Sequence, residues 1–175
     1  MEKSIKSSAI NYGVYLGGLL ALITVLIYAI NINLMVNMWI GIGLLIVIVG
    51  FGIGSTAKSK SFFEGFLSFK QAFSSYFITV AIGIAISTAV SAILFNFIDP
   101  DAAEVIKEKT IEATIGFMEG FSAPPEAIAE AVEKLEGQNQ YGILNLLKSL
   151  AWGLLFQSII GLIVAAIMKK TNPDA

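Results

Sequence analysis

The side chains best able to do chemistry in this chain are carboxylates, and most of them lie between residues 99 and 142. This stretch holds ten acidic residues against three lysines. Clustered carboxylates can bind divalent cations, but the opening Asp-Pro-Asp lacks the ordered spacing and the glycine of a calcium-binding loop. We expect a solvated acidic surface, with cation binding as the alternative. The acidic residues are Asp99, Asp101, Glu104, Glu108, Glu112, Glu119, Glu126, Glu130, Glu133 and Glu136.

Several residue types that carry much of protein chemistry are missing. The chain has no cysteine, no histidine and no arginine. It therefore lacks a thiolate, a histidine base for a serine nucleophile and a guanidinium group that grips phosphate with two hydrogen bonds. We expect a protein that is not an enzyme, uses no cofactor or bound metal and does not bind nucleic acid.

Uncharged polar residues within apolar segments are the other candidates for function. Gln157 lies near the middle of the last apolar segment, where an unpaired amide is costly. We expect it to bond to another helix, with a pore or ligand contact as the alternative. Ser87 and Ser91 share one face of an earlier segment and belong to the same alternative. Lys148 and Trp152, near the start of the last segment, are expected to reach the membrane interface.

Glycines recur four residues from another small residue in every apolar segment. This spacing puts small residues on one helix face, where they let two helix backbones approach closely. We expect them to pack helices, either within one chain or between copies of a homo-oligomer. These glycines are Gly13, Gly17, Gly50, Gly54, Gly83 and Gly161.

The composition indicates a membrane protein, so membrane-spanning helices must position the polar residues and glycines of the apolar segments. Hydrophobic residues make up 56% of the chain and charged residues 14%, and the mean hydropathy is +0.79. Crossing a bilayer takes about 20 apolar residues, and four segments are long enough: 9–30, 34–54, 72–98 and 149–168. The first is too long for a signal peptide, so we expect it to be retained. The predicted fold class is an all-α integral membrane protein, a four-helix transmembrane bundle with an acidic extramembrane helical hairpin.

Lysine placement predicts how the chain is threaded through the membrane. Lys3 and Lys6 precede the first span, three lysines lie between the second and third, and Lys169 and Lys170 follow the fourth. Lysine is enriched in cytoplasmic loops. We therefore expect both termini and residues 56–71 on the cytoplasmic side.

Residues 99–142, between the third and fourth spans, are expected to form two helices on the extracytoplasmic side. The opening pair Asp99-Pro100 is typical of an N-cap followed by the first helical position. Pro124-Pro125 interrupts the chain and starts a second helix, which a later glycine is expected to end.

The sequence SFFEGFLSFKQAF predicts a cytoplasmic interfacial helix that leads into the third span. Its phenylalanines recur at helical spacing, and Ser61 and Glu64 fit a capping box. The phenylalanines would enter the acyl boundary while lysines stay among the headgroups. The alternatives are an ordinary start of the span, with the phenylalanines packed on other helices, and a docking or gating segment. The residues assigned to the interface are Phe62, Phe66, Phe69, Lys70 and Phe73.

Several stretches of the chain resemble a known family. They are SAINYGVYLGG at 8–18, SFKQAF at 68–73, FNFIDP at 95–100 and the acidic connection that follows. Together they resemble the uncharacterised bacterial four-span proteins catalogued as domain of unknown function 4199. The resemblance covers nearly the whole chain and implies a bacterial inner-membrane protein with the topology described above. It implies no activity and no catalytic residues.

The expected function follows from the missing chemistry and the long acidic connection. Connections of this length are usually functional, so we expect a non-enzymatic accessory or assembly subunit that contacts a protein partner through residues 99–142. The alternative is a small oligomeric transporter or channel for a cation or small solute. A membrane enzyme is the third hypothesis. In each case the lipid bilayer is a partner.

Overall fold

The computed structural model describes residues 2–170, without the side chains of residues 2 and 3. Predictions that involve the chain ends or the side chain of Lys3 therefore lie outside the described residues. All elements named in the described part are helical. They are α1 (Glu2–Ile30), the 3₁₀-helix η1 (Ile32–Val36), α2 (Met38–Ser61), α3 (Phe69–Ile93), the π-helical turn η2 (Leu94–Ile98), α4 (Pro100–Gly120), α5 (Pro125–Glu136) and α6 (Ile143–Met168).

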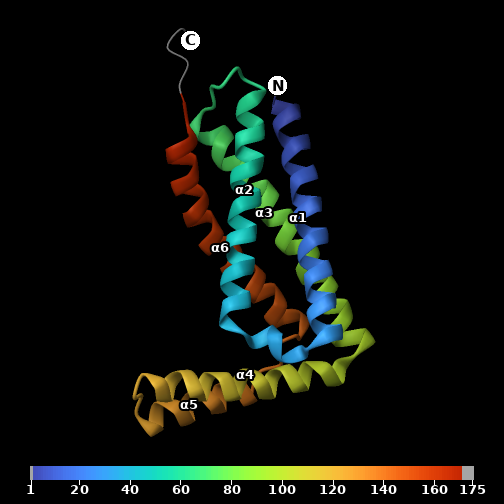
Figure 1. Ribbon diagram of the computed structural model, residues 1–175, viewed down its shortest axis with the longest axis vertical. Helices are drawn as coiled ribbons and strands as arrows, with labels where there is room; N and C mark the ends of the chain where they lie inside the picture. The colour runs from blue at the N-terminus through green and yellow to red at the C-terminus, as the bar shows by residue number, and fades with distance from the viewer. Residues whose placement is uncertain (1, 171–175) are drawn as a thin grey trace.

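Four of these helices, α1, α2, α3 and α6, are long and apolar enough to cross a membrane. They run together as a bundle in which α3 contacts the other three (Figure 1). By length and composition this is a multi-pass membrane protein, as the hydropathy of the sequence predicts. The qualifying stretches are Ser4–Ile30, Met38–Ser61, Phe69–Ile98 and Ile143–Met168.

The helices differ from the predicted spans at ends where side chains bond to the backbone. α2 begins at Met38 rather than at 34, because the Asn37 side chain accepts hydrogen bonds from Trp39 N (2.9 Å) and Ile40 N (3.3 Å). Asparagine is among the preferred N-cap residues for this reason. α6 begins at Ile143, well before the predicted 149, so it takes in the polar residues near Lys148. Hydropathy alone does not detect such ends.

The predicted interfacial helix that begins at Ser61 is wrong. α2 continues to Ser61, whose hydroxyl donates to Lys58 O over 2.7 Å instead of capping a new helix. Glu64 and Gly65 then take positive φ values of 52° and 89°. A left-handed backbone ends helical periodicity, and glycine adopts it at little cost. The apparent repeat of phenylalanines therefore runs across a turn.

The capping box lies further along the chain, at Ser68 and Gln71. Gln71 N donates to Ser68 Oγ over 3.3 Å, and Ser68 N donates to Gln71 Oε1 over 2.9 Å. This reciprocal pair satisfies two backbone donors at the start of α3. The predicted row of phenylalanines is thus divided: the first two lie in the turn, and Phe69 and Phe73 lie on α3.

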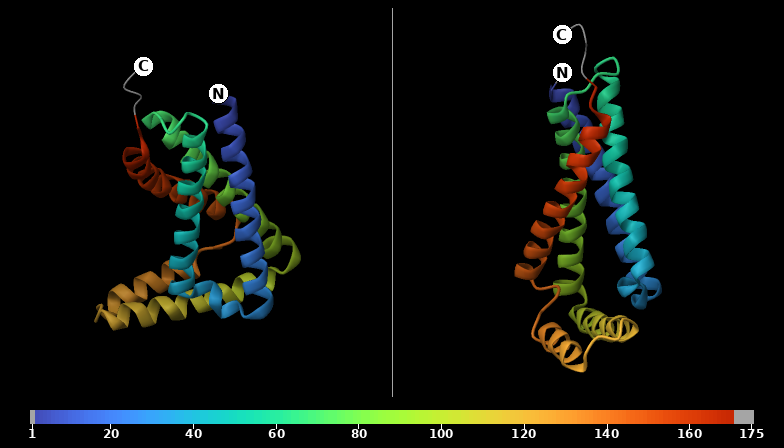
Figure 2. Two further views of the ribbon diagram at one scale, coloured as in Figure 1. Left: turned by 45° about the horizontal axis from the view of Figure 1, so that its top comes forward. Right: turned by 90° about the vertical axis from the view of Figure 1, so that its left-hand side faces the viewer.

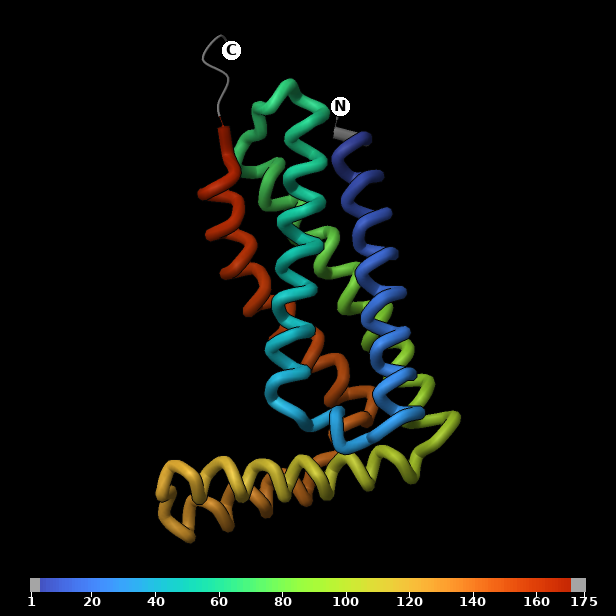
Figure 3. Tube along the Cα trace, in the orientation of Figure 1, coloured from blue at the N-terminus to red at the C-terminus, as the bar shows by residue number. Residues whose placement is uncertain are grey.

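The two shorter helices, α4 and α5, lie side by side across one end of the bundle and extend past it to one side (Figures 1 and 3). Among the described elements, α5 packs against α4 alone. The chain reverses at 121–124, where Ser122 has a φ of 55°, and α5 starts with Pro125 in its first turn. Gly137 is the C-cap of α5. We call Pro100–Glu136 the arm.

The two ends of the bundle carry different charges. The start of α1, the turn at 62–68 and the end of α6 gather at one end (Figure 2). Leu67 and Lys170 exchange two backbone hydrogen bonds of 2.9 Å there, which tie the turn to α6. We call this the lysine end, because most lysines outside residues 99–148 lie near it. The opposite end, which holds η1 and the arm, is the arm end.

Candidate functional site

Buried hydroxyls join three of the long helices. Ser55 and Ser59 of α2 and Ser75 and Thr79 of α3 are fully buried. Ser75 Oγ lies 3.0 Å from Ser55 Oγ and 2.8 Å from Ser59 Oγ. Thr79 Oγ1 lies 2.8 Å from Ser55 Oγ and 3.0 Å from the carbonyl oxygen of Ala9 in α1. Because hydrocarbon offers hydroxyls no other partner, this cluster holds α1, α2 and α3 together.

Gln157 of α6 lies in the bundle interior and is 3% exposed. The phenol of Tyr76, which is fully buried in α3, donates to Gln157 Oε1 over 2.7 Å. In the described part of the chain, every buried side-chain nitrogen and oxygen has a hydrogen-bond partner. The geometry is that of an interhelical hydrogen bond. Sequence reasoning missed Tyr76 because the two residues are 81 positions apart.

The predicted glycines of α1 and α3 lie at the closest helix contact. An added Cβ would come within 2.8 Å of Ile82 at Gly13 and within 2.7 Å of Ile86 at Gly17. At Gly83 it would lie 2.5 Å from a leucine side chain of α1. Real Cβ atoms do not approach this closely, so these positions require glycine if the two helices are to keep their separation.

The other predicted glycines divide into two kinds. Gly161 of α6 faces the ring of Tyr76, which would lie 2.7 Å from an added Cβ. Gly50 has open space beside it, and Gly54 has only an ordinary contact at 3.6 Å, so neither sets a helix separation in this chain. Gly52, which sequence reasoning missed, does: an added Cβ would lie 2.4 Å from Tyr76. Sequence reasoning overlooked Gly52 because it lies between Gly50 and Gly54, which are spaced four residues apart.

Ser87 and Ser91 line a largely apolar cavity of about 240 Å³ between the four long helices. Thr88 also lines this cavity, so α3 contributes three hydroxyl groups to its wall. The opposite walls are aliphatic and come from α1, α2 and the start of α6, with Leu20, Ile48 and Leu146 among them.

Asp99 joins the end of η2 to α1 and α4. Its Oδ2 accepts a hydrogen bond from the phenol of Tyr28 in α1 (2.6 Å), and its Oδ1 accepts one from Ala102 N (3.1 Å). The predicted role of Asp99 as an N-cap is therefore confirmed. The bond from Tyr28, and then the bond from Ala102, lower the pKa of the Asp99 carboxyl below its ordinary value of 3.8.

An apolar cluster fixes the base of the arm next to Asp99. Leu94 and Phe95 of η2 pack with Ala102 and Ile106 of α4, and all four are buried. Tyr141, just before α6, packs on Phe95 with ring centroids 4.3 Å apart, and burial raises the pKa of its phenol to about 12. The base of the arm is thus attached to both chain segments that connect it to the bundle.

The residues predicted for the interface lie at the lysine end. Phe62 and Phe69 are 39% and 41% exposed, and Lys70 is exposed as well. Phe66 lies under the ammonium of a lysine that follows α6, 5.2 Å from its ring centroid. Phe73 is half-buried against a core cluster at this end. The five therefore do not share one face, and their contact with lipid stays a prediction.

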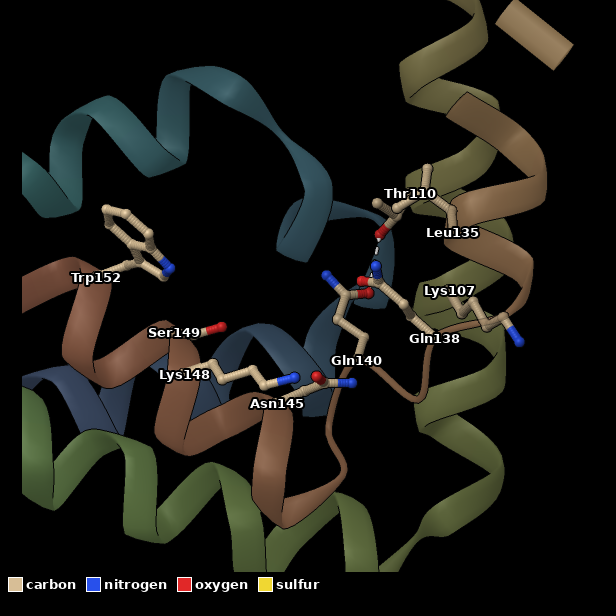
Figure 4. A pocket seen from close by; sticks show the side chains of 9 residues that line it. All are labelled: Lys107, Thr110, Leu135, Gln138, Gln140, Asn145, Lys148, Ser149 and Trp152. Carbon is tan, nitrogen blue, oxygen red and sulfur yellow. Dashed lines mark hydrogen bonds between the residues drawn. The ribbon is translucent and has the colours of Figure 1, made fainter. Parts of the chain in front are cut away.

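A polar pocket of about 350 Å³ lies where the arm meets α6 (Figure 4). Its walls come from α4, from the end of α5 with the linker that follows, and from the first turns of α6, including Trp152. Sequence reasoning placed Lys148 and Trp152 at the interface but missed the pocket, because the α4 wall comes from a distant part of the chain, with Thr110 30 positions before Gln140. Its polar lining residues include Lys107, Thr110, Gln138, Gln140, Lys148 and Ser149.

The acidic residues of the arm are spread out rather than gathered. Every one of them is exposed. Among residues 2–170 there is no group of three or more acidic, histidine or cysteine side chains placed to hold a metal ion.

A family model described as a protein of unknown function, DUF4199, matches residues 11–170. The chain belongs to this family. The match includes most of α1, all of α2, α3 and α6, and the whole arm. No curated protein and no solved structure matches the chain. For this family member, function has to be argued from its own residues.

The bond between Tyr76 and Gln157 makes a prediction about stability. Gln157→Leu leaves the Tyr76 hydroxyl buried without a partner, which typically costs about 1–3 kcal/mol. The free energy of unfolding in mixed micelles should fall by about that amount. The double variant Tyr76→Phe/Gln157→Leu removes both polar groups and should recover most of the loss. A matched control is Ser158→Ala, whose hydroxyl bonds within α6. If the double variant is less stable than Gln157→Leu, the bond is not the cause.

The bond between Tyr28 and Asp99 makes a prediction about pH. Because the pKa of Asp99 is lowered in the folded protein, the bond stabilises the fold fully above pH 3.8, and this stabilisation is lost as the pH falls through the lower folded-state pKa. The difference in melting temperature between wild type and Tyr28→Phe should therefore be constant near neutrality and shrink at lower pH. Tyr15→Phe, at a residue of α1 that is 67% exposed, is the control. A difference that persists unchanged at low pH contradicts the assignment.

Proposed function

We propose that this family member is a non-enzymatic accessory or assembly subunit whose arm docks on another membrane-associated protein. The observation that carries the proposal is the attachment of the arm at one end only. Its base is held by Asp99 and the apolar cluster, whereas α5 packs on α4 alone. A helix pair that extends past its own bundle in this way offers a large surface to a partner (Figure 3).

The exposed residues of the arm indicate what kind of partner surface would bind it. The apolar side chains of α5 are half-buried against α4, so the arm presents its acidic residues outward. At its tip, Phe117 and Phe121 are 56% and 75% exposed, with ring centroids 4.9 Å apart. Aromatic anchors within a charged surface are typical of protein interfaces. The partner would carry a basic surface with an apolar recess for the two rings.

The charge of the two bundle ends supports an orientation. The lysine end, with the start of α1 and the end of α6, would face the cytoplasm, and the arm would lie outside the bacterial inner membrane. The residue repertoire supports a non-enzymatic role, because the chain has no histidine, cysteine or arginine.

The second candidate function is a small oligomeric transporter. The cavity of about 240 Å³ with its three hydroxyls favours it. The other polar groups of the bundle interior count against it. Ser55, Ser75 and Thr79 bond to one another or to backbone, and Gln157 bonds to Tyr76. Flux through reconstituted vesicles, for a panel of cations and small solutes, would establish this function in place of the first.

The orientation can be tested by labelling, because the chain has no native cysteine. Ser61→Cys lies at the lysine end and Ala129→Cys on α5, and both positions are exposed. A membrane-impermeant maleimide should label Ala129→Cys in spheroplasts and Ser61→Cys only after the membrane is opened. Labelling of both from the same side would refute the proposed topology.

The proposed role predicts a partner that depends on the tip of the arm. Full-length tagged protein, purified gently from its native membrane, should retain one protein at a fixed ratio by quantitative mass spectrometry. Truncating an interface anchor typically costs about 2 kcal/mol or more, so Phe117→Ala/Phe121→Ala should lower recovery about tenfold or more. Phe62→Ala, at the lysine end, is the control. If no protein is retained, or if the tip variant retains it fully, the proposed role is wrong.

A further inference from the structure

The pocket at the base of the arm has the opposite charge to its surroundings. Lys107 and Lys148 are its only charged lining residues, and no carboxylate lines it. The acidic residues of the arm are all exposed. In the part of the chain that the structure describes, no carboxylate oxygen lies within 4.0 Å of the Lys148 ammonium. A cation without a carboxylate partner in a pocket lined by no acidic group favours an anionic ligand.

The neutral side chains of the pocket supply further hydrogen-bond donors. The Thr110 hydroxyl donates to Ile106 O over 2.8 Å and lies 3.4 Å from the carbonyl oxygen of Gln140, so the NH₂ group of Gln140 stays available as a donor. Gln138 and Gln140 lie together in the middle of the pocket, and the ammonium of Lys148 extends toward them along the α6 wall (Figure 4). Ser149 adds a hydroxyl from the next position on α6. A phosphate group suits this set, because its oxygens accept several hydrogen bonds at once.

Lys107 can complete the pocket by a rotation of its side chain. Its aliphatic part lines the pocket, while its ammonium points away from Lys148 (Figure 4). The ammonium lies 3.8 Å from Glu104, whose side chain is 71% exposed. An exposed ion pair at this distance is weak, so a phosphate in the pocket can compete for the lysine.

The location on α6 relates the pocket to the membrane surface. Lys148 and Trp152 are four residues apart on one face of the first turns of a membrane-spanning helix. Trp152 is 71% exposed, and tryptophan at this depth prefers the headgroup region. The lipid phosphates of the adjacent leaflet therefore lie at about the level of the Lys148 ammonium.

We propose that this pocket binds a phosphate group, supplied by the headgroup of an anionic phospholipid, between the arm and α6. Lys107 would hold the phosphate from α4, Gln140 from the linker, and Lys148 and Ser149 from α6. Because α5 packs against α4 alone among the described elements, such a ligand would tie the arm to the helix at which the chain re-enters the membrane.

The test uses the delipidated full-length protein in detergent. Native mass spectrometry and thermal unfolding are followed with added phosphatidylglycerol, phosphatidylethanolamine or inorganic phosphate. Wild type should bind phosphatidylglycerol in preference to phosphatidylethanolamine and melt at a higher temperature with it. Lys148→Gln should weaken this binding about tenfold, the effect typical of losing a charged hydrogen-bond donor. Lys134→Gln, an exposed arm lysine outside the pocket, is the matched control and should bind like wild type.

The outcomes separate the sources of the phosphate. A shift with inorganic phosphate that is lost in Lys148→Gln would support the site but assign it to a soluble phosphate compound. If Lys148→Gln binds phosphatidylglycerol as wild type does, the site is refuted. Lys107→Gln, which changes the opposite wall, should also weaken binding and serves as a second variant if Lys148→Gln does not fold. Equal binding of both lipids by wild type would refute the proposal as well.

Discussion

Hydrocarbon contains no water, so each polar group carried into the membrane needs a partner within the protein. α3 meets this constraint for the whole bundle. Ser75 and Thr79 bond to α1 and α2 on one side, and Tyr76 bonds to Gln157 of α6 on the other. The ring of Tyr76 also fills the space beside Gly52 and Gly161, which have no side chain. Ser75, Tyr76 and Thr79, which lie close together on α3, thus fix the positions of α1, α2 and α6.

The arm end of the bundle is organised differently. The long helices diverge toward it (Figure 2), and both the cavity beside Ser87 and Ser91 and the polar pocket beside Lys148 lie there. Fewer hydrogen bonds join the helices at this end, and Asp99 and the apolar cluster around Phe95 act instead at the connection to the arm. Regions with few packed contacts open at lower free energy. Binding sites are therefore better sought at this end than in the tightly bonded middle.

The sequence predicts the four spans because apolar length is a local property, and it predicts the N-cap at Asp99 for the same reason. It fails at residues 61–73, where regular phenylalanine spacing conceals the left-handed turn at Gly65. For the candidate site, composition shows that Gln157 needs a partner but not which one. The pocket is not predictable in this way, because Lys107 of α4 and Lys148 of α6 line it together only once the chain is folded.

The arm is connected to the bundle through two chain segments that are held in different ways. The chain enters the arm from η2, where Asp99 is bonded to α1, and leaves it into α6, which is bonded to α3 through Gln157. Among the described residues of α6, no side chain before Gln157 hydrogen-bonds to α3. At 1.5 Å per residue, the stretch from Ile143 to Gln157 is about 20 Å long. This half of α6 lines both the cavity and the pocket, and its tie to the third span is made just before it begins, where Asn96 Nδ2 donates to Tyr141 O over 2.8 Å.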